Sequence, residues 1–324
     1  SGDLRQATKV TMEAGASIDA SATDKGDGGK VVLWSDVHSA DSVTRVTGSI
    51  KAEAGPNGGD GGKIETSGHQ LDVADVSIST KSQNNATGEW LLDPWDITIA
   101  SSGAAGTTWA SGTTGTTTKT YTSAATSTIF DTSITGALST SNVVVSTGGT
   151  AGDGNGSGNI TVTTDLSWSS AKTLTLTALG GVSGTGNISM TGATGAGLIF
   201  NQAGNSTYSG NISGTNATFT KQGAGTLALS GNNSYGGGTT LTAGVLNLGS
   251  ASAIGNSGTI SFGGGTLQHS AYNYTTDYSS RFGATSQTYK IDNNGYDITL
   301  ASALGTSFTN TLTKIGSGTL TLTG

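Results

Sequence analysis

Residues 219–231 read FTKQGAGTLALSG, and residues 312–324 read LTKIGSGTLTLTG, the same pattern 93 residues later (219 to 312). Each copy joins two strand-like segments through a Gly-x-Gly turn. In the second segment leucines alternate with small or hydroxylated residues, as they do when successive side chains point to opposite faces of a strand. A unit that recurs in this way predicts a fold built by stacking similar turns of chain.

Shorter repeats lie between these copies and near the N-terminus. Gly225-Thr-Leu-Ala-Leu, Gly244-Val-Leu-Asn-Leu and Gly265-Thr-Leu-Gln-His begin 19 and 21 residues apart (225, 244 and 265). Gly26–Lys30 and Gly59–Lys63 both read GDGGK, with an offset of 33 residues, and each lies between two strand-like segments. Both ends of the chain are therefore predicted to be repetitive.

The strand pattern also occurs in the middle of the chain. Asn159–Thr163 reads NITVT and Thr173–Thr177 reads TLTLT. No segment shows an apolar period of 3.6 residues over three turns, so we expect almost no helix. Short strands, glycine turns and a period near 20 residues predict an all-β fold, a single-stranded parallel β-helix (β-solenoid) rod. An array of β-sandwiches is the alternative, but it would need a regular series of Asn-Gly hairpins, which the sequence lacks.

Composition agrees with a thin core that is spread along a rod. Of the 324 residues, 33% are hydrophobic and 11% charged, 53 are glycine and two are proline. Disordered chains usually combine low hydrophobicity with high net charge, whereas the net charge here is −7. The absence of cysteine excludes cysteine-ligated zinc and cysteine nucleophiles. Nothing resembles a basic patch for nucleic acid or an apolar run of membrane-spanning length.

Two stretches resemble known families of exported proteins. Gly88–Ile99 reads GEWLLDPWDITI and resembles the WLLDP motif of filamentous-haemagglutinin-like exoproteins of two-partner secretion systems. Thr220–Gly255 reads TKQGAGTLALSGNNSYGGGTTLTAGVLNLGSASAIG and resembles the passenger-associated strand repeat of autotransporters. A second copy of that repeat begins at Lys314.

These resemblances imply a right-handed β-helix that is exported to the Gram-negative cell surface with the help of an outer-membrane secretion partner. They imply a role in adhesion, aggregation or biofilm formation, with host or sister cell surfaces, glycans or identical copies of the chain as partners. A self-assembling filament is a variant of this role. The sequence contains neither a secretion domain with its Asn-Pro motif nor a C-terminal barrel, so we expect it to be part of a longer protein.

The repeats also suggest four segments. Residues 1–99 form haemagglutinin-like coils that end in WLLDPWDITI, and residues 100–135 form irregular coils or a loop rich in serine, threonine and glycine. Residues 136–218 form further coils, and residues 219–324 form autotransporter-type repeats.

The sequence predicts no catalytic residue, no cofactor site and no metal site. Asp93 and Asp96 form the nearest approach to a pair of catalytic carboxylates, but an Asp-Pro sequence more often opens a turn. The remaining polar candidates are better explained as surface or turn residues: the pair Asp36 and His38 on one side of a strand, His69, His269, and the two GDGGK aspartates Asp27 and Asp60.

One segment is a candidate binding site. AYNYTTDYSSRFG, residues 271–283, interrupts the coil rhythm and holds an unusual share of the aromatic residues. Exposed tyrosine and arginine are frequent in binding surfaces. Stacking of the rings over a long loop is the alternative. The candidate residues are Tyr272, Tyr274, Tyr278 and Arg281.

Other functions remain as alternatives. A polysaccharide lyase or hydrolase with the same fold would need a groove of acidic and basic residues from adjacent coils. An ice-binding solenoid would need flat, regular threonine rows. Several Asn-x-Ser/Thr sequons are expected by chance in so polar a chain, although they would permit glycosylation: Asn85, Asn159, Asn187, Asn205, Asn211, Asn216 and Asn232.

Overall fold

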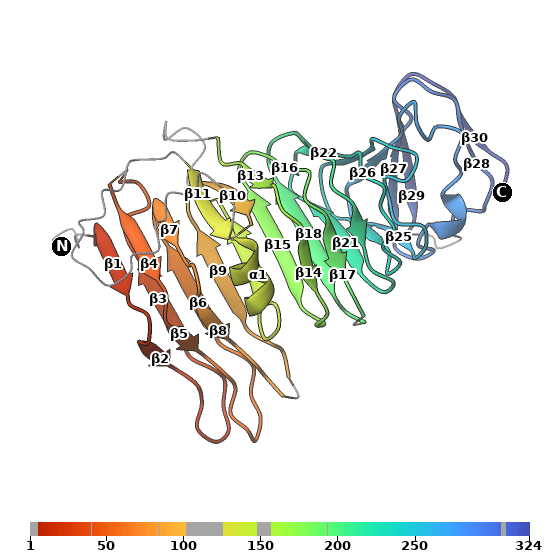
Figure 1. Ribbon diagram of the computed structural model, residues 1–324. Coiled ribbons are helices and arrows are strands. Elements are labelled where there is room, and N and C mark those ends of the chain that lie inside the picture. Colours follow the sequence, from red (N-terminus) through yellow and green to blue (C-terminus); the bar gives the residue numbers. More distant parts are fainter. Residues whose placement is uncertain are drawn as a thin grey trace, which may run out of the picture.

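The computed structural model describes residues 6–39, 41–83, 85–101, 126–147, 157–192, 194–305 and 309–324. The chain winds into an elongated rod, with the first and the last described strands at its opposite ends (Figure 1). Within the described residues, neighbouring strands of every sheet pair in parallel. The predicted all-β parallel β-helix is thereby confirmed.

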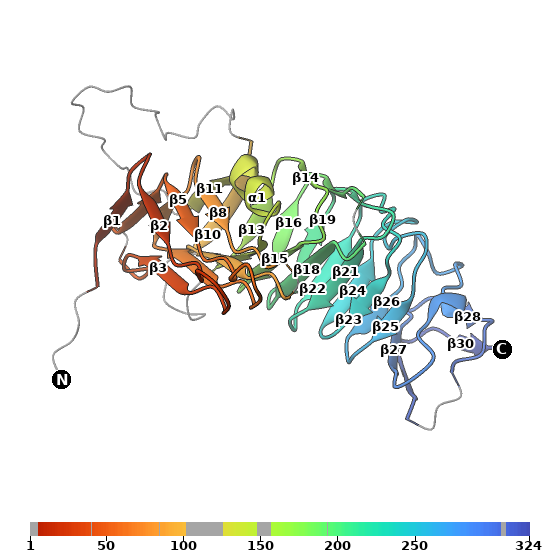
Figure 2. The ribbon, with the colours of Figure 1, turned by 90° about the horizontal axis from the view of Figure 1, so that it is seen from below.

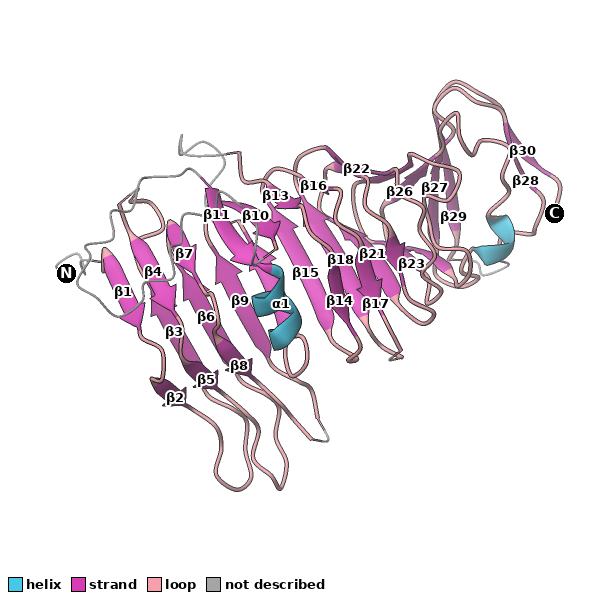
Figure 3. Ribbon diagram, viewed as in Figure 1, coloured by secondary structure: helices cyan, strands magenta, loops and turns pink. Residues whose placement is uncertain are grey.

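One face of the rod is a sheet of nine strands. Each strand belongs to a different coil, and strands of successive coils lie side by side (Figure 3). Along the rod the strands are β3 (Lys30–Trp34), β6 (Lys63–Ser67), β9 (Glu89–Asp93), β12 (Asn142–Ser146), β15 (Thr173–Ala178), β18 (Gly197–Gln202), β21 (Thr218–Gln222), β23 (Thr239–Leu241) and β25 (Ile260–Phe262).

A second face holds ten strands, and a three-stranded sheet extends it toward the N-terminus, where β7 contacts β11. The short sheet contains β1 (Lys9–Met12), β4 (Val43–Val46) and β7 (Gln70–Asp72). The ten strands, in spatial order, are β11 (Thr126–Phe130), β10 (Asp96–Ala100), β13 (Ile160–Val162), β16 (Val182–Gly184), β19 (Ser206–Tyr208), β22 (Thr226–Leu229), β24 (Val245–Leu248), β26 (Thr266–Gln268), β27 (Thr288–Asp292) and β29 (Thr311–Ile315).

The third face is shorter and mixed. A seven-residue helix, α1 (Asp131–Ala137), contacts β8 on one side and β14 on the other (Figure 2). A 3-10 helix, η1 (Ser279–Arg281), and a two-stranded sheet lie near the C-terminus. The strands are β2 (Ser17–Asp19), β5 (Ser49–Lys51) and β8 (Ser77–Ser79) before α1, β14 (Leu166–Trp168), β17 (Ile188–Met190) and β20 (Ile212–Ser213) after it, and β28 (Ile298–Leu300) with β30 (Leu320–Leu322) at the end.

The core consists of inward side chains that stack from coil to coil. In β15 the leucines are buried and the threonines half-buried, as the alternation predicts. Register places Trp90 beside Val143, Val143 beside Leu174, and Leu174 beside Leu198. All four are fully buried. Burying a side chain of this size contributes about 1.5–3 kcal/mol, so each coil is stabilised mainly by its neighbours.

The order of two strands departs from the order of the sequence. β10 pairs with β13 on one side and with β11 on the other, so β11 lies between β7 and β10 in space although it follows both in the chain. Residues 102–125, which connect β10 to β11, lie outside the described residues. Most of the Ser/Thr/Gly-rich segment predicted as irregular coils or a loop therefore cannot be compared with the structure. The last part of that predicted segment, residues 126–135, is described, and it forms β11 and the start of α1.

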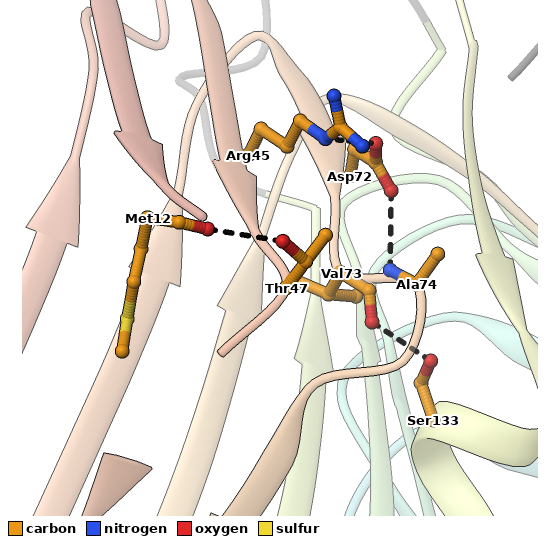
Figure 4. Close-up of polar contacts among 7 residues, drawn as sticks. All are labelled: Met12, Arg45, Thr47, Asp72, Val73, Ala74 and Ser133. Atoms are coloured by element: carbon orange, nitrogen blue, oxygen red, sulfur yellow. Dashed lines mark hydrogen bonds and ion pairs between the residues drawn. The ribbon is translucent and has the colours of Figure 1, made fainter. Parts of the chain in front are cut away.

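Hydroxyl side chains join the coil of β11 and α1 to the coil before it. Ser127 Oγ donates to His69 O (3.3 Å), Ser133 Oγ to Val73 O (2.9 Å) and Thr140 Oγ1 to Ile78 O (2.9 Å). Figure 4 shows the bond from Ser133 and, beside it, the chain of contacts that links the first three coils. In that chain Thr47 Oγ1 donates to Met12 O, Arg45 forms an ion pair with Asp72, and Asp72 Oδ1 accepts from Ala74 N. Between β7 and β11, which belong to different sheets, side-chain bonds thus help to join the coils.

The sequence repeats correspond to stacked strands. The GDGGK offset of 33 residues places Lys30 beside Lys63 in the pairing of β3 with β6. The three short Gly-introduced strands form β22, β24 and β26, which pair in series. Both repeats therefore mark positions that lie one coil apart.

Candidate functional site

The first copy of the 13-residue repeat, residues 219–231, forms a corner between the two long faces. Its lysine, Lys221, occupies an inward position of β21, between Phe200 and Leu241 of the adjacent coils, and is fully buried. Its ammonium Nζ donates to Gln222 O (2.6 Å) and Gly223 O (2.9 Å). Burial lowers the pKa of Lys221 to about 8. The lysine thus supplies hydrogen-bond donors to the carbonyls of its own turn.

Other repeat residues complete the corner. Gly223 has a φ of 73°, which favours glycine, and a Cβ on Gly225 would overlap the carbonyl oxygen of Gly204 in the preceding coil. At the next corner, after β22, Asn233 bridges two coils, because its Oδ1 accepts from Ile212 N and its Nδ2 donates to Ala253 O. Each of these residue types is thus required by the path of the chain.

The second copy forms the same local turn at the end of the rod. Gly316 has a φ of 86°, and Lys314 Nζ donates to Gly316 O at 2.7 Å, as Lys221 does to Gly223. However, its first strand, β29, belongs to the ten-stranded face, whereas β21 belongs to the nine-stranded face. The repeat therefore encodes a corner and not a fixed face of the rod.

Residues 219–248 and 312–324 match the family Passenger-associated-transport-repeat. This is the repeat of autotransporter passenger domains, so the resemblance predicted for these segments is confirmed. A search of curated proteins finds no match. The haemagglutinin-like character of residues 1–99 and the segment boundaries stay predictions.

The predicted binding segment holds two exposed tyrosines. Tyr272 is 69% and Tyr274 39% exposed. The ring of Tyr274 stacks on the ring of Tyr296, with centroids 5.1 Å apart and planes inclined by 22°. Tyr296 was not among the predicted residues, although its distance of 22 residues from Tyr274 (274 to 296) is about one coil and could have indicated it. We call Tyr272, Tyr274 and Tyr296 the tyrosine patch.

The other two predicted binding residues have internal contacts. Tyr278 is 7% exposed, and its ring lies 6.0 Å from that of His269. Arg281 donates from Nε to Gly258 O, from Nη1 to Gly255 O and from Nη2 to Ser257 O. Three backbone carbonyls of the previous coil thus hold the guanidinium, and burial lowers the pKa of Arg281. Tyr278 was expected to be exposed, but it is buried. Both residues support the loop that presents the tyrosine patch.

The histidines lie in two separate places. The rings of His38 and His69 contact the ring of Trp95, at centroid distances of 6.1 and 5.9 Å. His38 follows β3 in a turn and is not on a strand as predicted. His269 is fully buried near the C-terminus, where desolvation lowers its pKa. Within the described residues, no group of three or more His, Cys, Asp or Glu side chains is placed to hold a metal ion.

Three of the aspartates singled out in the sequence, Asp27, Asp60 and Asp96, accept backbone hydrogen bonds between coils. Asp96 Oδ1 accepts from Asn159 N (2.7 Å). Asp27 Oδ1 accepts from Asp60 N (2.8 Å), and Asp60 Oδ1 accepts from Ala86 N (3.0 Å). These bonds satisfy N–H groups at the corners of the coils. Trp90 and Leu92 of the WLLDP segment are fully buried in the core.

Several sequon asparagines have the same structural role. Asn187 Oδ1 accepts from Asn211 N (3.0 Å), and Asn211 Oδ1 accepts from Asn232 N (2.7 Å). The series begins one coil earlier at Asp165, whose Oδ1 accepts from Asn187 N (2.7 Å). Such a ladder explains why asparagine recurs at one corner in successive coils, and this explanation does not depend on glycosylation.

A search of the described residues for membrane-spanning helices gives none of sufficient length and hydropathy.

Proposed function

We propose that the chain is the shaft of a secreted, cell-surface adhesin of a Gram-negative bacterium, which promotes adhesion, aggregation or biofilm formation. The observation that carries the proposal is the pair of passenger-type repeats within one continuous parallel β-helix. Because every coil depends on its neighbours for burial, such a rod is a suitable spacer that can carry contact surfaces away from a membrane.

Contact through the tyrosine patch is part of this proposal. Tyr272 and Tyr274 are exposed, and the stack on Tyr296 restricts the ring of Tyr274. Rigid aromatic side chains give contact area at a low cost in conformational entropy. The patch would bind glycans or proteins of host or sister cells, and many weak contacts along a cell surface would add up by multivalency.

Beads coated with the 324-residue chain test the proposal. They should adhere to cultured animal cells or to bacterial cells more than beads coated with an unrelated protein. The double variant Tyr272→Ser and Tyr274→Ser should reduce adhesion, whereas Leu179→Ser, which changes another exposed apolar residue, should leave it unchanged. Absence of adhesion and aggregation by the wild-type chain would refute the function, and equal loss in both variants would refute the role of the patch.

Self-association is a variant of the same function, as predicted from the sequence. Negative-stain electron microscopy of the purified chain at neutral pH distinguishes the two forms. Long fibres would favour filament formation through identical copies, and single rods would favour contact with other cells or glycans.

A further inference from the structure

One row of inward side chains changes from leucine to histidine just before the tyrosine patch. Strand register places Leu229 beside Leu248. The pairings of β24 with β26 and of β26 with β27, continued by one residue, extend this row to His269 and Asn293. All four side chains are buried. Because leucine fills the same position in two earlier coils, packing alone does not require an imidazole here.

The imidazole of His269 is buried as a polar group without an internal partner. Neither ring nitrogen forms a hydrogen bond with a described residue, and the same holds for Asn293 Oδ1 in the next coil. A buried polar atom without a partner costs about 1–3 kcal/mol, so its presence in a core calls for an explanation. Protonation would add a charge to this position, and burying an unpaired charge costs far more than burying a neutral group.

The groups around the ring differ in their effect on a proton. Desolvation has the largest effect and lowers the pKa of His269, whereas the backbone of Asn273 and the carboxylates of Asp292 and Asp277 favour the proton. In the preceding coil the ring meets Leu248, which carries no charge. A proton on His269 is therefore disfavoured inside the core and favoured close to the two carboxylates.

The other titratable groups of the adjoining elements do not replace His269 as a proton acceptor. Burial raises the pKa of Tyr278, so its hydroxyl stays protonated in acid. Lys290 of β27 donates to Gly264 O, and Arg281 donates to Gly258 O and two further carbonyls of the previous coil. Both are cations at neutral pH and remain cations in acid.

His269 directly precedes the loop that presents the tyrosine patch. We call residues 270–283 the tyrosine loop. The ring of His269 lies 6.0 Å from the ring of Tyr278, so the imidazole supports the middle of this loop from inside the rod. Tyr272 and Tyr274 lie on the loop between these two residues.

Hydrogen bonds tie the tyrosine loop to the preceding coil at its two ends. Near its start, Asn273 Nδ2 donates to Leu248 O (2.7 Å) and Ser250 O (3.1 Å). Near its end, the guanidinium of Arg281 is held by three carbonyls. Since none of these donors or acceptors titrates in weak acid, His269 is the group of the loop floor that can respond to it.

We propose that His269 is a pH-sensitive switch, which keeps the tyrosine loop packed on the rod at neutral pH and releases it in weak acid. A protonated ring would leave the core for water and the carboxylates of Asp277 and Asp292, and its contact with Tyr278 would be lost. Tyr274 would then leave its stack on Tyr296. The inference rests on the proposed adhesive function and adds its regulation, since contacts made through the patch at neutral pH would be released in acid.

The expected size of the response follows from proton linkage. The closed loop disfavours the proton, whereas the open loop accepts it near the ordinary pKa of histidine, about 6.5. The equilibrium constant for loop opening should therefore rise about tenfold between pH 7.5 and pH 5.5. The rest of the rod should not share this rise.

Hydrogen–deuterium exchange of the complete 324-residue chain, read by mass spectrometry at these two values of pH, measures the response. Rates for peptides that cover residues 270–283 are divided by the rates of the urea-unfolded chain at the same pH, and β15 is the internal reference. The wild type should lose protection about tenfold in the tyrosine loop and not in β15. His269→Leu, which copies Leu248, should lose none, and His269→Gln provides the same test if the leucine variant does not fold. His38→Asn, at an exposed histidine distant in the chain, should respond like the wild type.

Beads coated with wild type or His269→Leu and bound to cells at pH 7.5 then test the regulatory role. On transfer to pH 5.5, wild-type beads should detach and His269→Leu beads should stay attached. Unchanged loop protection in the wild type, an equal acid response in the His269 variants, or equal loss of protection in β15 would overturn the switch. Attachment that survives acid while the loop opens would overturn its regulatory role. If wild-type beads adhere at neither pH, the adhesive function falls, and the exchange experiment still decides whether the switch exists.

Discussion

Replacing Lys221 by methionine removes a buried ammonium group while keeping an unbranched, flexible side chain. In the folded chain Lys221 is fully buried, with its two hydrogen bonds made to Gln222 O and Gly223 O. Burial lowers the pKa of this lysine from 10.5 to about 8. The folded protein therefore loses this proton at lower pH than the unfolded chain does.

The sign and size of the effect follow from this difference. Between pH 8 and 10.5 the unfolded chain retains the proton that the folded chain has lost, so the contribution of Lys221 to stability rises with pH. Each unit of pKa corresponds to about 1.4 kcal/mol, which sets an upper limit of about 3 kcal/mol. About 1.4 kcal/mol of this should be present at pH 9, where the folded form is largely neutral. Well below pH 8, at about pH 7 and lower, both forms hold the proton and the contribution is constant at its minimum.

Urea unfolding followed by far-ultraviolet circular dichroism, at several values of pH from 7 to 10, measures the effect. The difference in unfolding free energy between wild type and Lys221→Met should increase with pH. Taking the difference removes the contribution of the tyrosines and other groups common to both proteins. Lys314→Met is the matched control, because Lys314 holds the same position in the second repeat but is exposed. Parallel pH profiles for wild type and Lys221→Met would refute the burial of a charged lysine in the core.

Two further predictions concern the close approach of coils and a buried histidine. Gly225→Ala should destabilise the rod by about 2 kcal/mol or more, because its Cβ would overlap Gly204 O. The control Gly263→Ala, at a position with room for a Cβ, should be nearly neutral in the same thermal unfolding experiment. Equal melting temperatures for the two variants would contradict this account. His269 has a lowered pKa because of desolvation, so the unfolded chain gains its proton first as pH falls below about 6.5 and stability decreases. The variant His269→Leu should lose this acid sensitivity between pH 7 and 5, and an unchanged pH profile would show that His269 is not buried as a neutral group.

The architecture could be predicted because the same physical requirement recurs in every coil. Each strand must turn an apolar row inward, so Leu174 and Leu176 in β15 alternate with threonine, and each close corner needs glycine, as at Gly225. Requirements that repeat at a fixed offset are visible in a single sequence. This is why the pairing of Lys30 with Lys63 follows from the GDGGK repeats.

Features that occur once could not be predicted in this way. α1 reads DTSITGA, and its seven residues are too few to establish a helical period. It is held by burial of Ile134 and Ala137 and by the bond from Ser133 to Val73 O, which depend on the neighbouring coil.

The inversion of β10 and β11 was hidden by similarity. Thr98 and Ile99 of β10 lie beside Thr128 and Ile129 of β11, so both strands present the same residue types in the same register. Either could stack on β13 by pattern alone, and only the tertiary arrangement decides which does. At the tyrosine patch, likewise, sequence showed the cluster of aromatic residues but not which rings the coils bury, so Tyr278 was expected at the surface and Tyr296 was overlooked.

The two copies of the repeat show what the motif itself determines. In both, the lysine ammonium bonds to the carbonyl of the second residue after it, which is a glycine with positive φ. This local arrangement is the same whether the lysine is buried, as in β21, or exposed, as in β29, and it occurs at junctions between different sheets. The motif therefore fixes the direction in which the chain turns and leaves the outward residues free to vary. A corner unit of this kind can lengthen a rod without specifying a ligand, so specific contacts should be sought where the repeat is interrupted, at the tyrosine patch.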